Sequence, residues 1–85
     1  MNPQRYSIEY ASSAIRDLDA LPAKTRNQVI RKIERLHAGL HGNIKRLQDD
    51  DFTYRLRMGD YRILFDVEGE LIIIRRVGHR KNIYD

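Results

Sequence analysis

Two alternating stretches on either side of a Gly-Asp pair constrain the fold of this chain more than any other feature. Residues 54–58 read YRLRM and residues 61–67 read YRILFDV. A period of two is typical of strands with one buried face, and a two-residue connection is typical of a tight hairpin. We therefore predict an antiparallel hairpin with three facing pairs on its core side. The pairs are Met58 with Tyr61, Leu56 with Ile63, and Tyr54 with Phe65.

A second turn and an apolar run extend this hairpin into a three-stranded meander. Residues 68–70 read EGE and residues 71–77 read LIIIRRV. The start of this run is apolar at consecutive positions, which is typical of a strand covered on both faces and inside a sheet. If alternation continues to its end, Arg75 and Val77 lie on the same face as Arg62.

The N-terminal half is predicted to form a strand and two helices. Alternation over residues 6–10 predicts the strand. Ser12 or Ser13 can cap the first helix. This helix should end at Leu21-Pro22, because proline lacks an amide donor and restricts the residue before it. Its predicted buried face consists of Ala11, Ile15 and Leu18.

The second helix is predicted over residues 23–38, with Gly39 as its stop. Apolar residues recur at helical spacing and define a buried stripe, namely Val29, Ile33, Leu36 and Leu40. Cations crowd its solvent side, namely Lys24, Arg26, Arg31, Lys32 and Arg35. Glu34 is the only acid among them.

Residues 41–53 show no clean period and are predicted to form a connecting loop. This stretch contains the acidic run at residues 49–51. We interpret the run as a solvated loop and not as a metal site. Consecutive aspartates converge poorly on one ion, and no histidine or glutamate lies beside them.

These patterns predict an α+β fold with the order β-α-α-β-β-β. An N-terminal strand and a helical hairpin would pack on an antiparallel sheet. The chain has 85 residues, too few to bury two cores, so we predict one domain over residues 1–85.

Composition excludes some kinds of site and favours others. Cysteine is absent, which excludes disulfides, thiolate nucleophiles and cysteine-ligated zinc. The longest apolar run, residues 71–74, is too short to cross a bilayer. The N-terminus also lacks an apolar stretch of signal-peptide length. We expect a soluble cytoplasmic protein with no membrane contact, and the net charge of +4 weakly favours an anionic partner such as nucleic acid.

The predicted hairpin places arginines together on its second face. Arg57 lies directly across from Arg62, and Arg55 lies next along the strand. Like charges opposed across a ladder are destabilising, and a bound anion would relieve them. Arg80 and Tyr84, in the tail, should gather near the same face, where guanidinium groups grip phosphate and a phenol stacks on a base. The residues alone are equally compatible with a solvated strand face that carries long cations.

The chain resembles a known superfamily in two segments, YRLRMGDYRILF at residues 54–65 and RVGHRKNIY at residues 76–84. Both are similar to the RelE-type branch of the RelE/ParE toxins, and Lys45 and Leu47 suit the loop that precedes the first segment. The resemblance implies two helices on an antiparallel sheet. It also implies a type II toxin that cleaves messenger RNA on the ribosome without a metal or cofactor. An acidic, partly disordered antitoxin would inhibit it within a hetero-oligomer.

The resemblance also implies roles for individual residues. Arg62 would stabilise the transition-state phosphate, Arg80 would lie near the leaving group, and Tyr84 would orient or stack on the substrate. The predicted catalytic set is Arg55, Arg62, Arg80 and Tyr84. The predicted substrate-binding set is Lys45, Arg57, Arg75, His79 and Lys81.

One departure leaves the general base open. Family members carry a lysine two positions before the residue matching Arg55, and Thr53 stands there in this chain. His79 is the nearby side chain with an ordinary pKa near neutrality, although it can equally be a residue that packs or caps. Positioning by the ribosome is a further solution. Two other functions stay open: a ParE-like poison of DNA gyrase, and an inactive module that binds nucleic acid or antitoxin.

Overall fold

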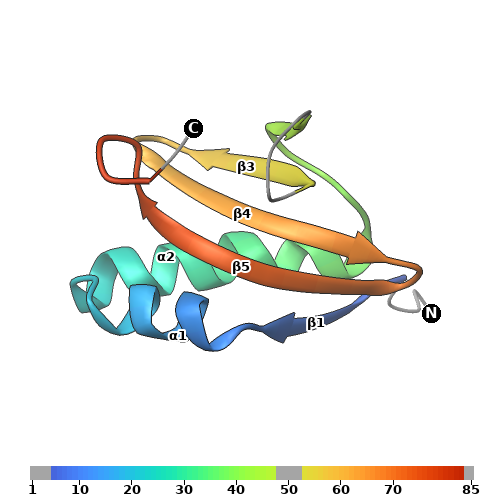
Figure 1. Cartoon of the computed structure of the whole chain (residues 1–85), viewed down its shortest axis with the longest axis horizontal. Coiled ribbons are helices and arrows are strands. Elements are labelled where there is room, and N and C mark those ends of the chain that lie inside the picture. The colour runs from blue at the N-terminus through green and yellow to red at the C-terminus, as the bar shows by residue number, and fades with distance from the viewer. Residues whose placement is uncertain (1–4, 48–52, 84–85) are drawn as a thin grey trace.

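The computed structural model describes residues 5–47 and 53–83. The elements follow the predicted order, with one short additional strand and a 3-10 turn. They are β1 (Ser7–Tyr10), α1 (Ser12–Asp19), α2 (Ala23–Glu34), the 3-10 helix η1 (Arg35–Ala38), β2 (Ile44–Arg46), β3 (Tyr54–Met58), β4 (Tyr61–Glu68) and β5 (Leu71–His79). The α+β class and the helical hairpin are therefore as predicted (Figure 1).

The central hairpin has the register that its alternation predicted. Its three core-side pairs are Met58 with Tyr61, Leu56 with Ile63, and Tyr54 with Phe65. Gly59 opens the connecting turn at a φ of 57°, in the left-handed region that glycine adopts without strain. The rings of the last pair stack with centroids 5.5 Å apart.

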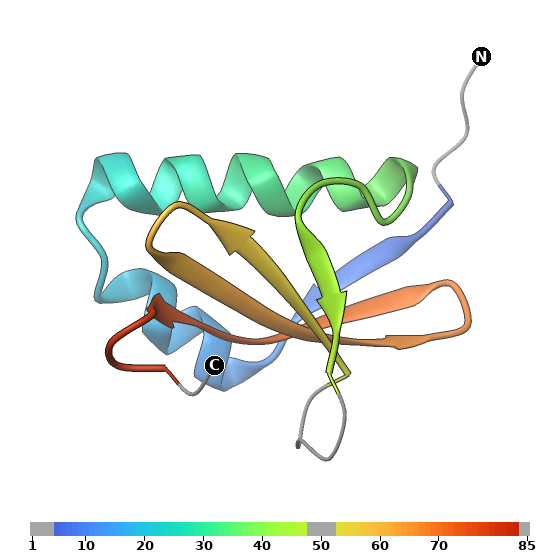
Figure 2. The same cartoon turned by 90° about the horizontal axis from the view of Figure 1, so that it is seen from above.

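The sheet is mixed, which the sequence patterns did not predict. Its strand order is β1-β5-β4-β3-β2. Only β1 runs parallel to its neighbour, pairing with the first half of β5, so that β5 lies inside the sheet as expected. The short strand β2 pairs with β3 at the opposite edge, as Figure 2 shows. The prediction of an unstructured connection over residues 41–53 missed β2, because three residues are too few to display a period.

A bulge in β5 corrects the predicted face of Val77. The ladder with β4 pairs Phe65 with Ile74 and Leu64 with Arg76, so Arg75 is an extra residue. An extra residue shifts the alternation of every later side chain by one. Val77 consequently lies in the core at 3% exposure and not on the face of Arg62.

The two helices cover one face of the sheet (Figure 1). Val29, Ile33 and Leu36 are fully buried, so the stripe predicted for the second helix is largely confirmed. The break at Leu21-Pro22 is also confirmed, because α1 ends before it and α2 begins after it. The last residues of the predicted second helix form η1 instead of continuing α2. Among the described helices, none combines the length and the apolar character needed to cross a membrane.

The first helix differs from its prediction in its cap and its buried face. Ala11 occupies the N-cap position, and no side chain caps the helix. Ala14 and Leu18 are its buried residues, whereas Ile15 is 48% exposed. The assumed cap at Ser12 or Ser13 was wrong because Ser13 bonds across to the sheet.

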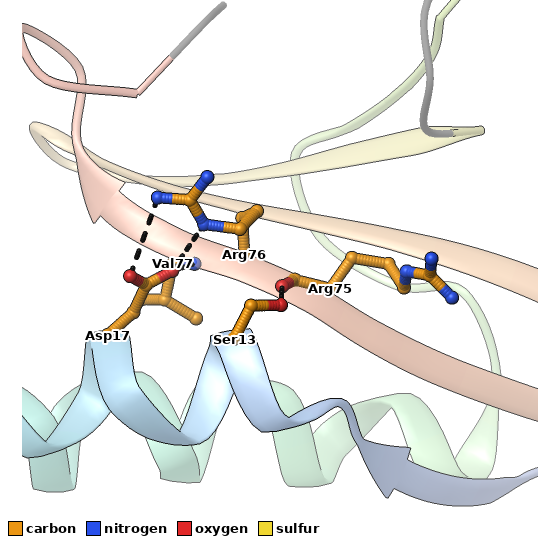
Figure 3. Close-up of polar contacts among 5 residues, drawn as sticks. All are labelled: Ser13, Asp17, Arg75, Arg76 and Val77. Carbon is orange, nitrogen blue, oxygen red and sulfur yellow. Dashed lines mark hydrogen bonds and ion pairs between the residues drawn. The ribbon is translucent and has the colours of Figure 1, made fainter.

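Helix α1 seals the part of β5 that β1 leaves unpaired (Figure 3). Pairing with β1 stops at Ile74. Beyond it, the Ser13 hydroxyl donates to the carbonyl of Arg75 at 2.7 Å, and Asp17 Oδ2 accepts from the amide of Val77 at 2.9 Å. Asp17 also accepts from Arg76 Nε at 2.8 Å, and this bond, with the charge of Asp17, raises the pKa of Arg76. Residues four apart on one helix face thus replace a neighbouring strand.

We expect Asp17→Ala to lower the free energy of unfolding by about 1–3 kcal/mol, since it leaves the partly buried amide of Val77 without its acceptor. Urea denaturation followed by circular dichroism measures this change. Asp19→Ala is the matched control, because Asp19 is exposed on the same helix. Equal stability of the two variants would contradict the role assigned to Asp17.

Candidate functional site

The face of the sheet turned away from the helices carries two adjacent cross-strand rows of cations. We call it the open face. One row places Lys45 beside Arg55, and the second places Arg57 beside Arg62. The predicted opposition of Arg57 and Arg62 is therefore present. Three strands each contribute cations to one surface.

Arg62 is almost completely buried, at 2% exposure. Its Nη1 donates to the carbonyl oxygens of Gly59 at 2.8 Å and Tyr61 at 3.0 Å. A buried cation requires such partners, because removing an unpaired charge from water is costly. The guanidinium is thus directed to the hairpin turn, while Arg57 across the ladder is exposed.

The segment that follows β5 folds back against the same hairpin turn. The amide of Arg80 donates to the carbonyl of Asp60 at 2.7 Å. The side chains form a loose ion pair, with Arg80 Nε 3.6 Å from Asp60 Oδ1. Asp60 therefore holds Arg80 at the turn to which the guanidinium of Arg62 is also directed. Lys81 follows and is exposed.

His79 lies on the opposite side of the sheet from Arg62. It pairs with Tyr61, whose side chain is on the core-facing side, and the two rings meet edge to face at 5.5 Å. Its Nδ1 accepts from the amide of Lys81 at 3.1 Å, so the proton of a neutral ring resides on Nε2. Nε2 is 4.0 Å from Asp60 Oδ2. These contacts describe a histidine that packs and caps the turn.

Position 53 is tied to a carboxylate that the sequence reasoning did not single out. Both the amide and the hydroxyl of Thr53 donate to Asp66 Oδ1 at 2.9 Å. Asp66 Oδ2 is 3.8 Å from Arg75 Nε, so Arg75 lies at the end of the open face away from the turn. Asp66 lies four residues after Arg62 on β4, so the two side chains share a face of the sheet. This shared parity is the sequence signal that would have found Asp66.

The tail passes close to the end of the sheet at Gly78. Gly78 pairs with Arg62, and a Cβ built there would lie 3.4 Å from Cβ of Ile83. Ile83 is 7% exposed, and its amide donates to the carbonyl of His79 at 3.0 Å. A separation of 3.4 Å is ordinary van der Waals contact, so Ile83 packs closely against position 78. Two sequence predictions, Tyr84 and the acidic run at 49–51, lie outside the described residues.

The structure brings some of the predicted residues together and separates others. The two rows unite Lys45, Arg55, Arg57 and Arg62, with Arg75 at one end and Arg80 at the other. His79 is on the other side of the sheet. Within residues 5–47 and 53–83, no group of three or more histidine, aspartate or glutamate side chains is placed to hold a metal ion. Paired guanidinium donors suit a chain of phosphates.

Comparison with known families gives a match over most of the chain. The family described as "ParE toxin of type II toxin-antitoxin system, parDE" matches residues 8–84. Toxin RelE3 of Methanocaldococcus jannaschii is 37% identical over 83 residues, which cover 92% of this chain and 94% of that protein.

Solved structures agree with this match. The RelB-RelE antitoxin-toxin complex from Methanococcus jannaschii contains a chain with 36% identity and a TM-score of 0.73, covering 89% of this chain and 94% of that one. The RelBE2 toxin-antitoxin complex from Mycobacterium tuberculosis gives 27% identity and a TM-score of 0.79, covering 91% and 93%. A mutant of the E. coli toxin RelE in the free state shares the fold, with 17% identity and a TM-score of 0.73 over 92% of this chain and 86% of that one.

We expect Arg57→Gln to raise the free energy of unfolding by about 0.2–1 kcal/mol, because it removes one of two like charges opposed across the ladder. Added salt should diminish the gain by screening the repulsion. Urea denaturation at low and high salt measures both effects. Arg16→Gln, at an exposed position of α1, makes the same charge change elsewhere. A gain no larger than that of the control would argue against repulsion in this row.

Proposed function

Since this chain belongs to the family of ParE toxins of type II toxin–antitoxin systems, we propose that it is a RelE-type toxin that inhibits translation by cutting messenger RNA on the ribosome. The observation that carries the proposal is the double cationic row on the open face, with Arg57 opposed to Arg62. Like charges opposed across a ladder repel, and a bound anion reduces that repulsion. An RNA phosphate supplies that anion, and a target on the ribosome implies a cytoplasmic location.

The proposed reaction uses the RNA itself as the nucleophile. The 2′-hydroxyl attacks the adjacent phosphorus, the bond to the 5′-oxygen breaks, and a cyclic phosphate and a 5′-hydroxyl remain. One proton leaves the 2′-oxygen and one reaches the departing 5′-oxygen. Between these events the phosphorane carries additional negative charge, which fixed cations stabilise more than they stabilise the substrate. None of these steps is assigned to a metal ion or a cofactor.

The cations of the open face take the electrostatic roles in this proposal. Arg62, with Arg57 opposite, would stabilise the phosphorane, and Arg62 would exchange a turn carbonyl for a phosphate oxygen. Arg80, which Asp60 holds at the same end, would stabilise charge on the departing oxygen. Arg55 and Lys45 would bind the neighbouring phosphates. Arg75 and Lys81 would extend this contact to its two ends.

Tyr84 would orient or stack on a base beside the cut. The contacts of Thr53 and His79 limit which side chain could accept the proton of the 2′-hydroxyl. Thr53 replaces the family's lysine and donates its hydroxyl hydrogen to Asp66. His79 uses Nδ1 as an acceptor for Lys81 and lies across the sheet from Arg62. We therefore favour alignment of the 2′-hydroxyl by the ribosome over a strong base from this chain.

We expect Arg62→Ala and Arg80→Ala each to reduce message cleavage by about 100-fold, because each removes a donor aimed at developing charge. The measurement is translation in a cell-free extract, followed by primer extension on the message. Arg16→Ala, at an exposed position of α1, should cut like the unchanged protein.

A second variant and a DNA-damage readout make this test decisive. Because Arg62 is buried, thermal melting must show that each variant is folded, and Arg62→Lys keeps the charge while removing the forked donors. An intact message with continued translation for the unchanged protein would reject the nuclease function. DNA damage under those conditions would favour the ParE-like action on gyrase.

We further propose that an antitoxin inhibits this chain, since two of the solved structures reported above are toxin–antitoxin complexes. An apolar groove between the helices offers it a docking surface, with a volume of about 350 Å³. Its lining residues are Tyr10, Ile15, Leu18, Asp19, Arg26, Ile30 and Glu34. Burial, together with the charge of Glu34, raises the pKa of Tyr10, so the phenol is neutral in this groove. Ile15 is the exposed apolar residue there.

We expect Ile15→Asp to weaken binding of the co-expressed antitoxin by about 10- to 100-fold, because burying an isoleucine contributes about 1.5–3 kcal/mol. Affinity of the purified toxin for its antitoxin, measured by calorimetry, gives the value. Ser12→Asp adds the same charge at an exposed position of α1 and is the control. Unchanged affinity for Ile15→Asp would move the antitoxin to another surface.

A further inference from the structure

A second group of cations lies on helix α2 and the turn that follows it, outside the site described above. Gln28, Arg31, Lys32 and Arg35 line a shallow depression of about 270 Å³. Their spacing of three and four residues places them on one face of the helix. We call Arg31, Lys32 and Arg35 the α2 cationic patch.

Within the part of the chain that the structure describes, the charge of this patch has no acidic partner. Among residues 5–47 and 53–83, no carboxylate lies within ion-pair distance of its three cations, and the ion pairs of Arg75, Arg76, His79 and Arg80 lie elsewhere. Glu34, the acid of α2, lines the groove beside Tyr10. Arg31 and Lys32 lie in the last turn of α2, where the helix dipole favours cations. Arg31 and Arg35, four residues apart, nevertheless repel each other. As on the open face, a bound anion would reduce the repulsion.

The patch and the open face are on different sides of the sheet. Helix α2 buries Val29 and Ile33 in the core, so its outer face is directed away from the sheet. The two surfaces approach each other at the β2 edge. A Cβ built on Gly42 would lie 3.8 Å from Cε of Lys32, and the carbonyl of the next residue, Asn43, accepts from the amide of Arg57 at 3.0 Å. This turn thus lies next to Lys32 of the patch and bonds to the backbone of Arg57.

The chemistry of the patch favours the backbone of folded RNA over a single strand. Proteins that bind single-stranded RNA combine a cationic groove with aromatic side chains on which the unpaired bases stack. The residues lining the depression offer long cations and an amide and no ring. Duplex RNA is recognised by shape and by its phosphates and 2′-hydroxyls, which such side chains contact.

We propose that the α2 cationic patch binds the phosphate backbone of double-helical RNA. This would be a second RNA contact, separate from the messenger RNA strand bound by the open face. This inference deepens the proposed function and rests on it, since it names a structured RNA as a partner of the same toxin. The second contact would hold the protein on a folded RNA while the open face engages the message.

The test is fluorescence anisotropy with a labelled RNA hairpin of about 16 base pairs, the span of a typical duplex-binding domain. The double variant Arg31→Gln/Arg35→Gln should bind about tenfold more weakly at physiological salt. For this double variant, the slope of log affinity against log salt concentration should be shallower by about 2, one for each lost phosphate contact. Arg5→Gln/Arg16→Gln makes the same charge change at exposed positions outside the patch and should bind like the unchanged protein.

Every outcome of this test decides for or against the patch. Equal weakening in the two double variants would reduce the effect to net charge and overturn the proposal. So would preference of the unchanged protein for single-stranded RNA, or binding of the hairpin that depends on Arg57 and not on the patch. Binding is measured without cleavage, so the two proposals are separable. Loss of hairpin binding in the patch variant of a chain that leaves messages intact would support the patch and reject the nuclease function.

Discussion

The pairing of β3 with β4 is the constraint on which the rest of this structure depends. Side chains alternate with a period of two, so a slip of one residue would move the apolar side chains of the slipped strand from the core to the solvent face. In the observed register, Leu56, Ile63 and Phe65 enter the core together, fully buried. The same register directs Arg57 and Arg62 to the open face as neighbours. The core and the candidate site are thus two consequences of one hairpin.

Such coupling links stability to function. The apolar face of the hairpin stabilises the fold, while the repulsion between opposed arginines subtracts from that stability. Two acids hold the cations at the ends of the open face, Asp66 beside Arg75 and Asp60 beside Arg80. Both acids position the end residues, and Asp60 also connects the tail to the turn. The α2 cationic patch repeats the same compromise on a helix.

The joint between α1 and β5 is a second requirement, because β5 is longer than the strand beside it. Ser13 and Asp17 supply the donor and acceptor that β1 would otherwise supply. This contact anchors α1 along the sheet edge and leaves Ile15 facing the groove and not the core. Helix α1, which covers the unpaired edge of β5, therefore also forms part of the proposed antitoxin surface.

The sequence by itself determined the elements whose signals are local. Alternation around Gly59-Asp60 specified the hairpin register and the opposition of Arg57 to Arg62, and Leu21-Pro22 specified the helix break. The resemblance over residues 54–65 and 76–84 pointed to the superfamily, because those segments carry the motif. Lys45 was assigned from the same resemblance, with no strand predicted around it. Its place beside Arg55 depends on β2, which is too short to show a period.

Tertiary structure decided what depends on contacts between distant segments. The parallel pairing of β1 with β5 joins the two ends of the chain, and no local pattern encodes it. The bulge at Arg75 moved Val77 into the core, since one unpaired residue reverses the parity of all that follow. His79 lies on the far side of the sheet because it pairs with Tyr61. Thr53 bonds to Asp66 because β3 and β4 lie side by side. Side-chain alternation is a property of one strand, whereas the partner across the ladder is a property of the whole fold.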